Sequence, residues 1–134
     1  LGKYYRSFCP NCNWLAKDEQ AIFICPHCAE PMIYGVWDRI RAIADWSGLV
    51  NHRPPYRAHV PLPMLPGIGP KTYVQMIHGL GTEIDILYNV SLESIGRLVG
   101  PSIAKYVAAV RDGTLLIEPG GGGKYGRVAK NLER

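Results

Sequence analysis

The sequence lacks the features that usually mark a membrane span, a secretory signal or a catalytic centre. No apolar run approaches the roughly 20 residues of a membrane-spanning helix, and no signal peptide begins the chain. It also lacks a His-x-His pair, a dense carboxylate cluster, a Walker loop, and a serine or cysteine nucleophile beside a base. We therefore expect a cytoplasmic protein with no membrane contact, whose chain by itself is not an enzyme.

Acidic side chains are few, and their spacing suggests no shared site. Asp38, Asp45, Glu83 and Asp85 fall on expected helices at spacings typical of solvated faces. The net charge is +4, and the excess lies after residue 50, where ten basic residues oppose six acidic ones. This basicity suits a polyanionic partner, although a solvated basic face would have the same composition. Leu1 is not an initiator methionine, so we expect a trimmed chain or a piece of a longer protein.

The cysteines form two Cys-x-x-Cys pairs, and the sequence has no others: Cys9, Cys12, Cys25 and Cys28. Four thiolates at this spacing can surround one tetrahedral ion, which is the geometry that zinc prefers. Disulfides are disfavoured without a secretory signal, and an iron site with the same ligands is the other alternative. We predict one structural Zn2+ because four thiolates leave no open coordination position. His27 would be a fifth ligand, so we expect it to be exposed.

Short strands and one helix should surround this metal site. We expect strands at Tyr4-Tyr5, at residues 21–24 and at residues 32–36. A helix is predicted over residues 37–47, with an inward apolar face made of Ile40, Ile43, Ala44 and Trp46. Trp37 and Trp46 could stack on bases, but on so apolar a helix we favour places in the core.

A Gly-x-Gly turn is the most informative motif of the second half. Gly67, Ile68 and Gly69 stand between apolar segments and open a helix whose first turn holds Lys71 and Thr72. Glycine permits an unusual backbone and close approach, and first-turn amides with a lysine suit one phosphate group. This pattern indicates a helix-hairpin-helix motif that binds the DNA backbone. A plain helix-loop-helix with glycine for tight packing is the alternative.

Further helices should follow this turn. We predict them over residues 71–78, 82–89, 91–99 and 102–111, with Ile103, Val107 and Val110 inward and Gly113 as the stop. The turn at Val99-Gly100-Pro101 resembles a degenerate copy of the first, without the second glycine or the lysine. The sequence therefore predicts a tandem helix-hairpin-helix domain with one weaker copy.

Two loop segments complete the set of candidate DNA contacts. Residues 51–66 hold five prolines, so they form no long regular element, and Arg53, Tyr56 and Arg57 lie within them. This segment either follows a DNA strand or is a plain linker. The tail reads as a strand, a four-glycine loop and a second strand. Its Lys124 and Arg127 flank the loop and could contact phosphate, while a flexible linker is the alternative.

The order of these motifs resembles the C-terminal part of endonuclease Q over nearly the whole chain. The matching segments are the two cysteine pairs, Gly35-Val36-x-Asp38-Arg39-Ile40, Ala44-Asp45, Arg53-Pro54-Pro55-Tyr56, Val60-Pro61-Leu62, Gly67-Ile68-Gly69-Pro70-Lys71, Arg111-x-Gly113, Pro119-Gly120 and Tyr125-Gly126. Enzymes of that family nick DNA 5′ of deaminated bases and abasic sites. The resemblance implies the DNA-binding portion of such an enzyme, without its N-terminal catalytic PHP-type domain. Tyr56 and the surrounding arginines are candidates for reaching toward a base that has left the stack.

We therefore expect an α+β protein: a small four-cysteine zinc ribbon, then an all-α helix-hairpin-helix domain with a short Gly-rich β tail. The expected divisions are a zinc ribbon (1–36), a connecting helix (37–50), a Pro-rich linker (51–66), the tandem helix-hairpin-helix (67–113) and the Gly-rich tail (114–134). The expected partners are DNA, bound largely independently of sequence, and the catalytic domain of the parent protein. The alternative function is a protein-interaction module of a DNA-processing complex.

Overall fold

The structure is a computed structural model that describes residues 1–17, 20–45, 52, 54 and 59–129. It is a mixed α/β chain that divides into two compact units. One, the four-cysteine unit, comprises Leu1–Pro55 and Ile117–Arg127, and the other, the helical unit, comprises Tyr56–Leu116 and Val128–Arg134. No helix within the described ranges has both the length and the apolar character needed to cross a membrane.

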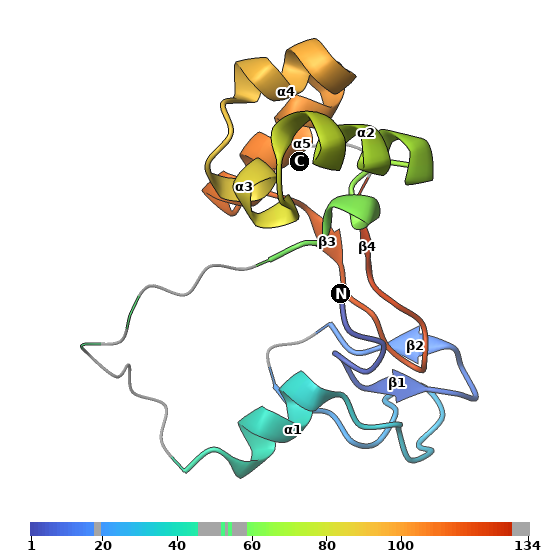
Figure 1. Ribbon diagram of the computed structural model, residues 1–134. Helices are drawn as coiled ribbons and strands as arrows, with labels where there is room; N and C mark the ends of the chain where they lie inside the picture. Colours follow the sequence, from blue (N-terminus) through green and yellow to red (C-terminus); the bar gives the residue numbers. More distant parts are fainter. Residues whose placement is uncertain (18–19, 46–51, 53, 55–58, 130–134) are drawn as a thin grey trace. The chain divides into compact units, whose positions relative to one another are not determined.

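Short strands and long connections make up most of the four-cysteine unit. Strands β1 (Phe8–Cys9) and β2 (Trp14–Leu15) pair in antiparallel fashion, with Phe8 opposite Leu15. Phe8 also exchanges two backbone hydrogen bonds with Ile33, at 2.9 and 2.8 Å. A second two-stranded sheet joins β3 (Ile117–Glu118) to β4 (Arg127–Val128). The loop between β3 and β4 lies beside the first residues of the chain, because Arg6 N donates to Gly120 O (Figure 1).

None of the three predicted strands forms in this unit. Residues 32–36 contain one isolated bridge, between Ile33 and Phe8, and a helix begins at Val36. Tyr4 and Tyr5 lie in a turn and a bend, and residues 21–24 form only an isolated bridge between Ile24 and Pro31. Ile24 is 55% exposed, so it does not contribute the buried face that an apolar strand would need. The chain around the cysteines forms mainly turns and isolated bridges, which explains why apolar character alone predicted strands wrongly.

Helix α1 (Val36–Ile43) is shorter than predicted and packs differently. Ala44 has an extended backbone, so the helix ends before it, and Trp46 lies outside the described residues. Ile40 and Ile43 were expected to face inward, but they are 58% and 56% exposed. The buried residue of α1 is Asp38, so polar contacts rather than an apolar stripe hold this helix.

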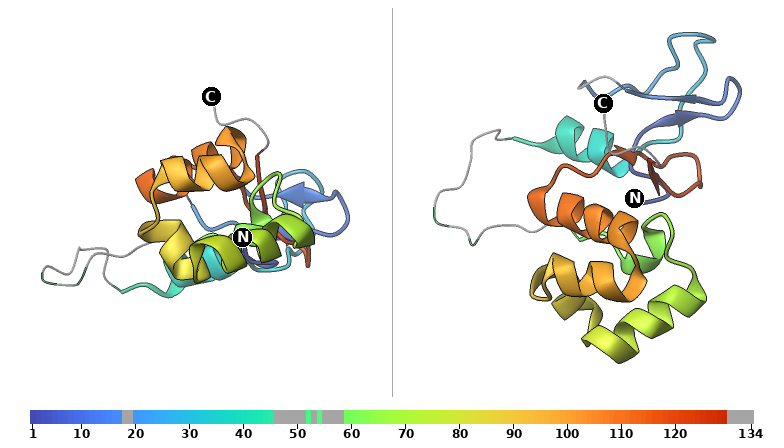
Figure 2. Two further views of the ribbon diagram at one scale, coloured as in Figure 1. Left: turned by 45° about the horizontal axis from the view of Figure 1, so that its top comes forward. Right: turned by 90° about the horizontal axis from the view of Figure 1, so that it is seen from above.

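In its described residues, the helical unit contains a 3-10 turn, η1 (Leu62–Met64), and four helices grouped together (Figure 2). These are α2 (Pro70–Leu80), α3 (Glu83–Tyr88), α4 (Leu92–Val99) and α5 (Pro101–Asp112). Their boundaries follow from capping, since the hydroxyls of Thr82 and Ser91 accept from backbone N–H groups and Gly113 adopts φ 69° at the end of α5. The predicted inward residues of α5, Ile103, Val107 and Val110, are buried.

The core of the helical unit draws on each of these elements. Its fully buried side chains are Leu62, Met76, Ile86, Leu87, Ile95 and Val107. Val60, Leu62 and Leu65 come from the proline-rich segment, so the end of that segment packs in the core as well as connecting. Arg111 joins α5 to the end of α3 by donating to the carbonyls of Leu87 (2.7 Å), Ile86 (2.9 Å) and Val90 (2.5 Å).

Candidate metal centre and nucleic-acid interface

The four cysteine sulfurs converge on one point. All lie within 4.8 Å of one another, with Cys9 Sγ 3.6 Å from Cys28 Sγ and Cys25 Sγ 4.0 Å from Cys12 Sγ. A tetrahedral ion with metal–sulfur bonds of about 2.3 Å separates its sulfurs by about 3.8 Å. The cluster therefore fits a metal ion held by four thiolates.

Local hydrogen bonds and burial shift the pKa values of the cysteine thiols. The backbone N–H of Cys12 donates to Cys9 Sγ at 3.4 Å, which favours a thiolate there, but burial and hydrogen bonds with Cys28 and Cys25 leave the pKa of Cys9 raised. The pKa of Cys28 is lowered to about 6, mainly by a hydrogen bond from the backbone at Glu30 and secondly by one with the Cys12 side chain. The pKa of Cys12 is raised to about 12, mainly by its hydrogen bond with Cys28 and secondly by burial. Cys28 thus ionises readily while Cys12 resists, because hydrogen bonding between the two side chains favours a thiolate on Cys28 and a thiol on Cys12. A bound cation would supply the charge that lets all four ionise.

The cysteines also belong to the small core of their unit. Cys9 and Cys25 are buried with Ala16 and Met32, and Trp14 packs against them. His27 is exposed and lies edge-on to Trp14, with ring centroids 5.3 Å apart, as expected for a residue outside the ligand set. A bound metal ion would add to the stability of a core this small.

The Gly-x-Gly turn begins α2 as the sequence indicated. Gly67 has φ 86°, a left-handed backbone that favours glycine, and Ile68 closes the turn by donating to Leu65 O at 3.2 Å. The Ile68 side chain is buried, which leaves Gly67 and Gly69 on the surface. Gly69 has an ordinary extended backbone, and a Cβ added there would meet no atom within 4 Å. Among the residues that the structure describes, neither backbone conformation nor packing explains glycine at position 69.

The first turn of α2 presents unused donors beside a cation. Pro70 occupies the first helical position and Gly69 provides no side-chain cap, so among the described residues the amides of Lys71 and Thr72 have no capping side chain and can meet an external acceptor. Lys71 is exposed and Thr72 is half-buried. Helix α5 also begins with a glycine, a proline and no side-chain cap, but Gly100 has φ 100° where Gly69 has φ −87°. Ser102 stands where the first turn has Lys71.

The two predicted DNA contacts of the tail, Lys124 and Arg127, differ in their interactions with the rest of the chain. Lys124 is exposed, while Arg127 forms an ion pair with Glu118 at 2.5 Å. The glycines that precede Lys124 lie against the chain itself, since a Cβ added to Gly122 would approach the Phe8 ring to 2.3 Å. The remaining predicted contacts, Arg53, Tyr56 and Arg57, fall outside the described residues.

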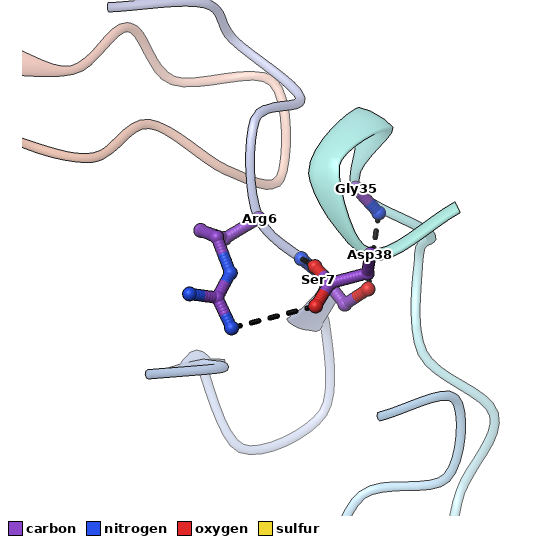
Figure 3. A network of polar contacts seen from close by, with 4 residues as sticks. All are labelled: Arg6, Ser7, Gly35 and Asp38. Atoms are coloured by element: carbon purple, nitrogen blue, oxygen red, sulfur yellow. Dashed lines mark hydrogen bonds and ion pairs between the residues drawn. The ribbon is translucent and has the colours of Figure 1, made fainter. Parts of the chain in front are cut away.

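Sequence reasoning missed a buried polar network in the four-cysteine unit (Figure 3). Asp38 was assigned to a solvated face, but it is fully buried and accepts from Ser7 N at 2.6 Å and from Arg6 Nη2 at 3.4 Å. Gly35 N donates to Ser7 Oγ at 3.0 Å, and the Arg6 guanidinium lies 4.4 Å from the Trp37 ring centroid. The resemblance motif contains both Gly35 and Asp38, which is the one indication the sequence offered.

Glu83 was also assigned to a solvated face and is instead a structural acceptor. It accepts from Leu62 N at 2.7 Å and from Tyr73 Oη at 3.0 Å, and it lies 3.9 Å from His59 Nε2. These contacts tie η1 and α2 to the start of α3. They place the segment that leads into the Gly-x-Gly turn.

Comparison with known proteins places these features in context. No family model matches the chain. It is 35% identical over 129 residues to the uncharacterised protein YqxK of Bacillus subtilis (strain 168) and 30% identical to the uncharacterised protein MJ0043 of Methanocaldococcus jannaschii. Both matches cover 96% of this chain, but only 33% and 18% of those proteins.

Solved structures give a clearer likeness. The lesion-specific endonuclease PfuEndoQ from Pyrococcus furiosus matches with a TM-score of 0.75 and 33% identity, covering 98% of this chain and 36% of that protein. Endonuclease Q in complex with a 27-mer duplex substrate, with an abasic lesion at its active site, matches with a TM-score of 0.74. Both matches support a relationship to a DNA-repair endonuclease. The chain spans about a third of the length of these endonucleases.

Proposed function

We propose that this chain is the DNA-binding portion of an endonuclease Q-like repair protein. The observation that carries the proposal is the likeness to endonuclease Q across 98% of the chain, together with the exposed turn that opens α2. Nicking 5′ of a deaminated base would belong to the whole parent protein. Its chemistry would lie in an N-terminal PHP-type domain that this chain does not contain.

Each unit then has a distinct role. The four-cysteine unit would be a zinc ribbon, with Zn2+ held by Cys9, Cys12, Cys25 and Cys28 as a structural ion. The helical unit would be a tandem helix-hairpin-helix domain, whose better copy is the turn before α2. There the amides of Gly69, Lys71 and Thr72 and the charge of Lys71 would hold one phosphate of the DNA backbone. Gly69 would be glycine because a Cβ would meet the phosphate rather than the protein.

Binding to duplex DNA over a salt series tests this proposal. The metal-loaded chain is titrated against short fluorescent duplexes that are normal, uracil-containing or abasic, and anisotropy gives Kd. We expect binding to all three that falls with salt, because each phosphate contact releases counterions. Lys71→Ala should weaken binding to all three about equally and reduce the slope of log K against log salt by roughly one.

Lys17→Ala is the matched control, because it removes the same charge from an exposed lysine of the other unit. It should leave the slope unchanged. If Lys71→Ala and Lys17→Ala behave alike, the phosphate site is not at this turn. If the folded wild-type chain binds no duplex even at low salt, the DNA-binding function itself is wrong.

The second candidate function is a protein-interaction module of a DNA-processing complex. The exposed apolar side chains of α1 favour it, since Val36, Ile40 and Ile43 are all more than half exposed. Absence of DNA binding, together with a stable complex with another protein through α1, would support this alternative.

A further inference from the structure

The four-cysteine unit has a cationic and aromatic surface of its own, which we name the Lys3–Tyr125 surface. It consists of Lys3, Tyr4, Lys124 and Tyr125. Two of these residues come from the first turn of the chain and two from the loop between β3 and β4. Backbone hydrogen bonds join the segments, since Gly123 N donates to Lys3 O at 3.2 Å and Gly126 N donates to Leu1 O at 3.0 Å.

A tight turn gives this surface a defined shape. Gly121 and Lys124 exchange backbone hydrogen bonds at 3.2 and 3.0 Å, and the two residues between them, Gly122 and Gly123, have φ 58° and 88°. Positive φ at both central positions is the pattern of a type I′ hairpin turn, for which glycine is favoured. Lys124 and Tyr125 therefore project from a short, hydrogen-bonded hairpin rather than from a loose loop.

The two tyrosines present open rings beside this turn. Tyr125 is 63% exposed and Tyr4 is 51% exposed. Lys3 Nζ lies 4.8 Å from the Tyr125 ring centroid, a cation–π contact that orients the ring and places a positive charge beside it. A Cβ added to Gly123 would lie 3.6 Å from the Tyr4 hydroxyl, so Tyr4 adjoins the same turn.

The positive charges of this surface are available to a partner. Within the described ranges, the ion pairs use neither Lys3 nor Lys124, whereas Arg127 on the neighbouring strand is paired with Glu118. Two available lysines beside two open aromatic rings suit a strand that offers both phosphates and unstacked bases. Protein–protein interface cores, by contrast, are depleted of lysine.

We propose that the Lys3–Tyr125 surface binds unpaired DNA, with a base stacked on Tyr125 and phosphates held by Lys3 and Lys124. This deepens the proposed function and rests on it, because it gives the four-cysteine unit a direct share in DNA binding. Tyr4 would provide a second ring for a neighbouring base. A nucleotide displaced from a damaged duplex and a single-stranded segment would share this chemistry.

The test compares single-stranded and duplex DNA with the full metal-loaded chain. The probe is a fluorescent oligothymidine of about 12 nucleotides, within the range of site sizes of single-strand binders. Tyr125→Ala should weaken its binding about 5-fold to 150-fold, the effect expected from loss of one base–aromatic stack. Tyr125→Phe keeps the ring and should bind close to wild type.

Lys124→Ala is a second variant that leaves the tyrosines intact and removes one exposed charge. It should reduce the salt slope for the single strand by about 0.7. Metal content and circular dichroism show whether each variant folds, and Lys124→Ala alone can decide the matter if Tyr125→Ala does not fold.

The possible outcomes distinguish failure of this inference from failure of the proposed function. If Tyr125→Ala and Lys124→Ala leave single-strand affinity unchanged while Lys71→Ala still weakens duplex binding, the Lys3–Tyr125 surface does not bind DNA and the proposed function stands. A protein contact would then be the better account of its exposed rings. If the wild-type chain binds neither probe, both proposals are wrong.

Discussion

Removing the carboxylate of Asp38 should destabilise the four-cysteine unit strongly, although the residue is remote from the metal ligands in sequence. Asp38 is fully buried, and its two oxygens accept from Ser7 N at 2.6 Å and Arg6 Nη2 at 3.4 Å. The Arg6 side chain is itself only 10% exposed. In Asp38→Ala the Ser7 amide loses its acceptor and the Arg6 guanidinium loses its ion pair with Asp38.

The size of the effect follows from these losses. Breaking a buried ion pair by removing one partner costs about 3–5 kcal/mol, and an unsatisfied buried amide contributes to that cost. Small domains are stable by about 5–15 kcal/mol, so Asp38→Ala would remove a large part of the total. Asp38→Asn keeps an acceptor for Ser7 N but loses the charge, and it should therefore cost less than Asp38→Ala.

Urea unfolding followed by tryptophan fluorescence measures the change. The chain has three tryptophans, at positions 14, 37 and 46, so the emission reports the four-cysteine unit. Trp37 is a direct probe of this network, with the Arg6 and Arg41 guanidiniums 4.4 and 4.9 Å from its ring centroid. Metal concentration is held constant, because a bound ion adds its own stabilisation.

Glu118→Ala is the control in the same unit. This substitution breaks the ion pair between Arg127, whose side chain is 79% exposed, and Glu118, whose side chain is 54% exposed. The loss should therefore cost only about 0–1 kcal/mol. If Asp38→Ala costs no more than Glu118→Ala, burial does not make the Asp38 contacts important and the reasoning from desolvation is wrong.

Two further changes test the separate stability of the units. Chelating the metal should unfold the four-cysteine unit, which changes the tryptophan emission, and adding Zn2+ should reverse that change. The ellipticity at 222 nm from the helical unit should largely persist, because the core of that unit contains no cysteine. Loss of both signals together would contradict this expectation. Arg111→Lys should lower the free energy of unfolding of the helical unit by about 2–3 kcal/mol, measured by urea unfolding followed by circular dichroism. A single ammonium cannot replace the guanidinium that donates to the carbonyls of Leu87, Ile86 and Val90. An unchanged midpoint would show that these three contacts add little.

Much of the candidate site could be predicted from local sequence. Spacing alone brought the four cysteines together, because two short Cys-x-x-Cys turns can deliver four sulfurs to one centre. Caps and stops predicted most boundaries of the helical unit, including Thr82, Ser91 and Gly113, since a helix terminus is specified by the few residues around it. The turn from Gly67 to Gly69 was recognisable for the same reason.

Only the tertiary structure decided which residues are buried and what holds α1. Ile40 and Ile43 have the spacing of an inward face but are exposed, whereas the charged Asp38 is buried because Ser7 and Arg6, some thirty residues earlier, supply its donors. The tail glycines were predicted to form a loop, but only the fold shows them against Phe8 and the first turn, where Lys3 meets Tyr125. The sequence by itself determined the local turns, the caps and the two Cys-x-x-Cys pairs, because each depends on neighbours within a few residues. Burial and long-range pairing depend on partners far along the chain, which no local pattern specifies.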